Sequence, residues 1–193
     1  MSELALSVVL GVALAAATGF RVFLPMLVVS AAAYTGHLQL DNSFAWLGTL
    51  PALMMLGVAA IAEVLAYYIP VLDNLLDTLA APAAFVAGTI ASAAVMVHMP
   101  PMVQWTAAII AGGGIAGLTH GVTGMIRAHS TVLTGGLGNA VLATAELLGA
   151  LVVAILAIAA PALAIGLVVA FLWLALRLVR QLRGTHSSSS QKG

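Results

Sequence analysis

The run from Leu4 to Tyr34 contains a single charged residue, Arg21, and constrains the fold more than any other stretch. A membrane-spanning helix needs about 20 apolar residues, so this run is too long for one untilted span and short for two. Gly19 and Pro25 flank the arginine, and a glycine, a cation and a proline are each unfavourable in hydrocarbon unless the protein interior compensates. We therefore expect one interrupted crossing, a helix break marked by Gly19 and Pro25, and an inward-facing Arg21.

The composition extends this expectation to the whole chain. Of its 193 residues, 63% are hydrophobic and only 6% are charged, whereas a soluble domain carries about 25% charged residues. The formal net charge of zero argues against a nucleic-acid partner. Because the chain has no cysteine, disulfides and thiolate metal sites are excluded. We expect an integral membrane protein surrounded by the lipid bilayer, with no cofactor and no metal.

Further apolar runs predict about six spans, so the expected fold class is an all-α polytopic transmembrane helix bundle. The later spans are expected over 47–69, 82–97, 102–118, 137–159 and 162–178, with a short interfacial helix over 71–79. Residues 1–183 would form a single transmembrane domain. The polar segment 184–193 is expected to be disordered.

The predicted spans also suggest an orientation and an internal symmetry. Arg177, Arg180 and Arg183 follow the last span, so the positive-inside rule places both termini in the cytoplasm. The halves 4–98 and 102–182 would hold three spans each and could form inverted repeats. In each half the first span is interrupted and the second carries one glutamate.

A few polar residues inside the predicted spans are the candidates for function: Arg21, Glu63 and Glu146, with Thr119 and His120 at the margin. A charge at the bilayer centre costs about 2.5–3.5 kcal/mol on insertion scales, so we expect Arg21 to pair with Glu63 or Glu146. Two interpretations stay open. The group is either a binding site in which a glutamate couples protons, or an ion pair that fixes the register of the helices.

A second polar group could lie at the cytoplasmic edge of the membrane. Asp73 and Asp77 are four residues apart on one helical face. Such a pair is more often simply exposed to solvent than bound to a divalent cation. Arg127 belongs to the glycine-punctuated stretch 119–130, whose amides could bind an anion. A polar connecting loop is the default interpretation of that stretch.

The block Gly19-Phe20-Arg21-Val22-Phe23-Leu24-Pro25 is the most specific part of a pattern that covers about 5–180. In this pattern the chain resembles a bacterial integral membrane family known only as domain-of-unknown-function family 4126. The resemblance implies a bacterial inner-membrane protein, and Asn139 matches a later asparagine of the family. The retained set is Arg21, Glu63, Asp73, Asp77, His120 and Glu146. Tyr67 and Tyr68 stand where the family has an acidic and a basic residue, and Leu147 replaces the second member of an acidic pair. These departures argue against a dense charge network, and the resemblance implies no activity.

Three functions remain compatible with these residues. We expect first a permease or channel-like transporter for a small, anionic solute, with Arg21 on the anion and Glu63 or Glu146 coupling protons. The alternative is a non-transporting assembly or lipid-binding module with a protein partner or a second copy of itself. A third is an intramembrane enzyme acting on lipid head groups through His120, Asp73 and Asp77, which the sequence supports only weakly because no nucleophile motif is present.

Overall fold

The computed structural model describes residues 3–189, without the side chains of 70–78 and 178–189. Every regular element in this described part is helical, which confirms the all-α fold class. The elements are α1 (Glu3–Phe20), α2 (Phe23–Tyr34), η1 (Asn42–Gly48), α3 (Leu50–Ala66), α4 (Pro70–Val95), α5 (Pro101–Ala107), η2 (Ala108–Gly113), α6 (Gly114–Thr134), α7 (Asn139–Ala159) and α8 (Pro161–Ser189).

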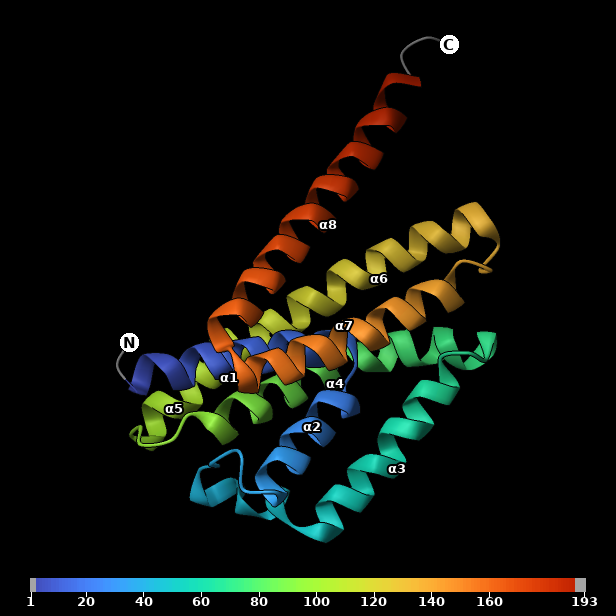
Figure 1. Ribbon diagram of the computed structural model, residues 1–193. Coiled ribbons are helices and arrows are strands. Elements are labelled where there is room, and N and C mark those ends of the chain that lie inside the picture. Colours follow the sequence, from blue (N-terminus) through green and yellow to red (C-terminus); the bar gives the residue numbers. More distant parts are fainter. Residues whose placement is uncertain (1–2, 190–193) are drawn as a thin grey trace.

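Helix α1 lies at the centre of the bundle, packed against α4, α6, α7 and α8 (Figure 1). The run from Ala13 to Ala17 is completely buried and consists of alanines and one leucine. Small side chains allow helix axes to approach closely in a membrane. The Ser92 hydroxyl of α4 donates to the Gly11 carbonyl at 2.8 Å, and a Cβ added to Gly19 would lie 2.5 Å from the Ala116 carbonyl oxygen of α6.

The first apolar run is broken where its sequence is least apolar. Helix α1 ends at Phe20 and α2 begins at Phe23, so Arg21 and Val22 form the junction. Helices α2 and α3 then run side by side away from the bundle, joined by the 3₁₀ helix η1, which meets α3 at 66° (Figure 1). We refer to α2, η1 and α3 together as the arm.

Two expectations about the middle of the chain are wrong. The interfacial helix over 71–79 and the span over 82–97 are one helix, α4, which continues through Pro82. Prolines are tolerated inside membrane helices because neighbouring groups satisfy the freed carbonyl. The stretch 119–130 is not a loop but the body of α6, which continues from α5 through the π-helical segment η2.

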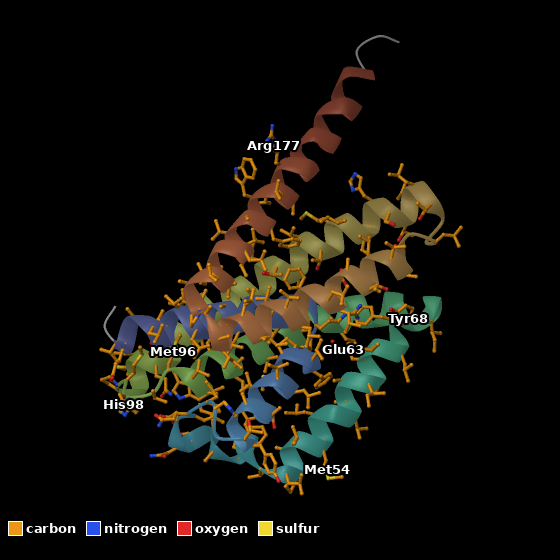
Figure 2. All side chains as sticks on the ribbon, in the orientation of Figure 1. Met54, Glu63, Tyr68, Met96, His98 and Arg177 are labelled. Atoms are coloured by element: carbon orange, nitrogen blue, oxygen red, sulfur yellow. The ribbon has the colours of Figure 1, made fainter. Side chains whose placement is uncertain are left out.

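Length and apolar composition identify three described segments that could cross a membrane: α1, the stretch from α5 to α6, and α7. The bent pair η1 and α3 would make a fourth. Shorter apolar helical segments are Phe23–Tyr34, Leu79–Val95 and Pro161–Arg177. Large apolar side chains point outward from α3, including Met54, Val58 and Ile61, which are 63–70% exposed (Figure 2). The chain is a helical membrane protein, and the count of six spans and the inverted repeat stay predictions.

Candidate functional site

Arg21 occupies the α1–α2 junction and is only 2% exposed. Its Nη2 donates to the Ala143 carbonyl of α7 at 2.8 Å and lies 3.6 Å from Glu146 Oε2. The junction places the arginine here because α1 stops one residue earlier, and its side chain reaches across to α7. A buried guanidinium beside a buried carboxylate is the arrangement expected of a charge inside a membrane bundle.

Arg127 of α6 is the second cation of the site and is 3% exposed. Its Nη2 donates a charge-assisted hydrogen bond to Glu146 Oε2, the same oxygen that faces Arg21. Two guanidiniums, one from the α1–α2 junction and one from α6, therefore share one carboxylate on α7.

Tyr67, the residue after α3, contacts both cations through its ring. The guanidinium carbon of Arg21 is 3.6 Å from the centre of its ring, and that of Arg127 is 4.8 Å away. The face of an aromatic ring carries negative electrostatic potential and attracts cations, so the ring offsets part of the repulsion between the two guanidiniums. The next residue, Tyr68, is hydrogen-bonded through its hydroxyl to Thr144 Oγ1 of α7 at 2.9 Å.

Glu63 of α3 caps the start of α2 rather than pairing directly with an arginine. Its Oε1 accepts from the Val22 amide at 2.7 Å and its Oε2 from the Phe23 amide at 3.0 Å. The first amides of a helix have no partner within the helix and favour an anion. Glu63 therefore serves as an internal anion at the helix break, near the end of α2 that faces the bundle (Figure 2).

Unsatisfied polar atoms gather at the same junction. In the described part of the chain, the buried side-chain nitrogens and oxygens without a hydrogen-bond partner are Arg21 Nε, Arg21 Nη1 and Thr119 Oγ1. The Thr119 side chain packs on α1 at Gly19, since an added Cβ there would lie 2.5 Å from Thr119 Cβ. Leaving a buried donor without a partner costs about 1–3 kcal/mol, and more for a charged group.

Two cavities flank the charged residues. The cavity of the arm, with a volume of 470 Å³, lies between α2, α3 and α4, and Val22, Phe23, Glu63 and Tyr67 are in its lining. The second, with a volume of 310 Å³, lies between α6, α7 and α8 with Phe20 of α1 at its floor, and Glu146 is in its lining. We call the second cavity the α7–α8 groove.

The structure thus brings Arg21, Glu63 and Glu146 to one region, with Thr119 close by and Arg127 joined to them. Gly19 lies in the last turn of α1 and Pro25 in the first turn of α2. His120 is half-buried on α6 next to Thr119, and its carbonyl accepts from the Thr123 hydroxyl. Arg127 is therefore part of the buried site and not of a loop at the membrane edge. The side chains of Asp73 and Asp77 lie outside the described residues, so their grouping with His120 stays a prediction.

Sequence reasoning missed the roles of Arg127 and Tyr67. The buried residues of α6 include Thr119, Val122, Thr123 and Arg127, which recur at helical spacing. That periodicity was the available signal, and the glycines at 121 and 124 obscured it. Tyr67 gave no comparable signal, because tyrosine at the end of a membrane helix is usually an interfacial residue.

Comparison with known proteins gives a family match. A family model described as "Domain of unknown function (DUF4126)" matches residues 8–181, nearly the whole chain and every residue of the charged site. No curated protein and no solved structure matches the chain.

Proposed function

Because the chain belongs to the domain-of-unknown-function family DUF4126, whose description names no activity, we propose a function from the buried site: a small membrane permease that carries an anion together with protons. The solute binds at the α1–α2 junction. The arm and the bundle meet there, and each supplies part of the binding site.

The observation that carries this proposal is the pair of unused donors on Arg21. Its Nε and Nη1 are buried without a hydrogen-bond partner, and so is the Thr119 hydroxyl. In a bilayer interior no bulk water can accept hydrogen bonds from these groups, so leaving these bonds unmade costs much free energy. A small oxyanion or halide that accepts from these groups would remove that cost.

The proton-coupling group in this mechanism is Glu63. Its carboxylate occupies the Val22 and Phe23 amides, which are the groups that would otherwise attract an anion to the start of α2. The solute and the Glu63 carboxylate therefore compete for the same donors. When Glu63 takes up a proton, it releases these amides to the solute, so one proton enters with each anion.

Broken helices whose half-helix N-termini face a bound anion are a recurrent design in secondary transporters. The α1–α2 junction, with α2 beginning at Phe23, supports the same design here. The 470 Å³ cavity of the arm reaches Glu63 and the first residues of α2, and it supplies the space that a small solute needs.

A flux experiment tests the proposal. The purified chain is reconstituted into liposomes that contain a pH-sensitive dye, and chloride, nitrate, phosphate and lactate gradients are imposed in turn. We expect one of these anions to enter with protons, and Arg21→Gln to reduce the flux per folded protein at least tenfold. Glu63→Gln should abolish the proton signal. The matched control is Arg177→Gln, since Arg177 is an exposed arginine far out on α8 (Figure 2).

Two results would reject the permease. One is a wild-type protein that moves none of these anions. The other is an Arg21→Gln variant that folds less well but retains full flux per folded molecule.

A second candidate function rests on a different observation. Arg21 is enclosed between Tyr67, Ala143 and Glu146 and is not among the residues that line either cavity. Such a closed arrangement is what a structural ion-pair cluster in a non-transporting module requires. That module would co-purify in mild detergent with a stable partner, either another protein or a second copy of the chain. A homogeneous monomer would count against it.

We place the protein in the bacterial inner membrane with both termini cytoplasmic. The support is the cluster of Arg177, Arg180 and Arg183 in the second half of α8. A reporter fused to the C-terminus, active only in the cytoplasm or only in the periplasm, tests the orientation.

A further inference from the structure

The second half of α8 carries most of the positive charge of the chain. Arg177, Arg180 and Arg183 recur at every third position of this helix, and Lys192 follows in the sequence. These are four of the six basic residues of the chain, whereas none of its six acidic residues comes after Glu146. The basic residues of this segment therefore have no acidic neighbour along the sequence.

The acidic residues lie on other elements, away from this half of α8. Helix α8 packs against α1, α6 and α7, and its second half then extends beyond the bundle (Figure 1). Figure 1 shows the start of α1, the arm, the start of α4 and the middle of α7 apart from it. Those elements carry the acidic residues, which are Glu3, Asp41, Glu63, Asp73, Asp77 and Glu146. Arg177 is exposed and points away from the bundle (Figure 2), so its charge faces the surroundings of the protein.

The position of Trp173 relates these arginines to the surface of the bilayer. Trp173 is 58% exposed, and the guanidinium carbon of Arg177 lies 5.3 Å from the centre of its ring. Tryptophan is enriched where hydrocarbon meets the head groups, and the apolar segment of α8 ends at Arg177. At the rise of an α-helix, Arg180 and Arg183 lie about 4.5 and about 9 Å further along the axis. The head-group layer is about 5–8 Å thick on each side of a bilayer, so the three arginines span its depth.

A positively charged helix segment at this depth fits the head group of an anionic lipid. We infer that residues 173–183, which we call the basic segment of α8, bind anionic phospholipids of the phosphatidylglycerol class. Guanidinium groups match phosphate because they donate two parallel hydrogen bonds to it. The acyl chains lie beside the exposed apolar side chains of Trp173 and Leu174. Phosphatidylcholine offers the same phosphate, but its ammonium group cancels the charge, so the arginines favour the anionic lipid.

Trp173 can itself report which lipid lies next to it. The chain has three tryptophans, so Trp46→Phe/Trp105→Phe leaves Trp173 as the single fluorophore. This full-length variant is reconstituted into bilayers that mix phosphatidylcholine and phosphatidylglycerol, with bromine on the acyl chains of one lipid at a time. Bromine quenches tryptophan fluorescence on contact. The quenching therefore gives the binding of phosphatidylglycerol at Trp173 relative to phosphatidylcholine.

We expect phosphatidylglycerol to bind at Trp173 at least fivefold more tightly than phosphatidylcholine at low salt. Sodium chloride at high concentration should reduce this preference because it screens exposed charges, and this measurement needs no substitution in the basic segment. Replacing Arg177, Arg180 and Arg183 together by glutamine should bring the ratio close to one. The matched control is Trp105→Phe/Trp173→Phe, which leaves Trp46 of η1, a 50% exposed tryptophan of the arm. No preference is expected there.

Three results would overturn the inference. Equal binding of the two lipids at Trp173 would mean that the arginines orient the chain without binding a particular lipid. An equal preference at Trp46 and Trp173 would mean that anionic lipid gathers around the whole protein. A preference that survives both high salt and the triple glutamine variant would exclude the arginines as its cause. None of these results bears on the anion flux, because the basic segment of α8 takes no part in the solute site.

Discussion

The charge balance of the buried site yields the most demanding prediction. Among the described residues, two cations, Arg21 and Arg127, and two anions, Glu63 and Glu146, gather at this site and are each at most 8% exposed. Arg127→Met removes a cation that is bonded to Glu146, and Glu146→Gln removes the carboxylate that Arg21 and Arg127 share. Removing one partner of a buried ion pair costs about 3–5 kcal/mol, so each single variant should lose about that much free energy of unfolding.

The double variant Arg127→Met/Glu146→Gln removes both charged partners of this pair together. It should therefore lose clearly less than the sum of the two single losses, with a coupling energy of about 3 kcal/mol. The assay is reversible unfolding of the protein in mixed micelles, read by circular dichroism, with Arg177→Met as the control for loss of an exposed arginine. Single losses below about 1 kcal/mol, or a double loss equal to the sum, would refute the reasoning.

The remaining predictions concern packing, the aromatic ring and the helix cap. Gly19→Ala places a Cβ 2.5 Å from a backbone oxygen of α6 and should lower the free energy of unfolding by about 1–3 kcal/mol. Gly114→Ala faces open space and should instead raise the unfolding temperature in detergent. Equal shifts of the unfolding temperature in the two variants would contradict the close approach of α1 and α6. Tyr67→Leu removes the ring from both guanidiniums and should destabilise by about 0.5–2 kcal/mol per contact, and Tyr67→Phe should lose less, as measured by denaturant titration. Glu63→Gln weakens the cap of α2 and should speed amide hydrogen exchange in the first turn of α2, while α7 stays protected. An equal increase of exchange along α2 and α7 would argue against a local cap.

Much of the fold and part of the site could be predicted from the sequence. The helix break at Arg21 could be anticipated because a cation, a glycine and a proline interrupt an otherwise apolar run. The course of α4 could not, because the effect of Pro82 depends on whether neighbouring helices satisfy the freed carbonyl, and a single sequence does not show those neighbours.

The contacts among the charged residues could be predicted only in part from the sequence. Replacement of charged residues by Tyr67 and Tyr68 suggested a sparser network, yet Tyr67 contacts two guanidiniums through its ring. A neutral side chain can stabilise cations as a carboxylate does, without adding a charge. Partners on distant helices, such as Arg127 and Glu146, become visible only when the helices are placed in space.

The close contacts along α1 have a mechanical consequence. Gly11 against Ser92 at one end and Gly19 against α6 at the other fix the helix both along its axis and about it. Such a helix behaves as a fixed rod, and a rod held at two points neither slides nor turns. Any large movement must then occur beyond its end, where Arg21 and Val22 join the rod to the arm. The link between α1 and the arm contains Arg21 of the buried charged group, so the solute proposed above would act directly at the joint between them.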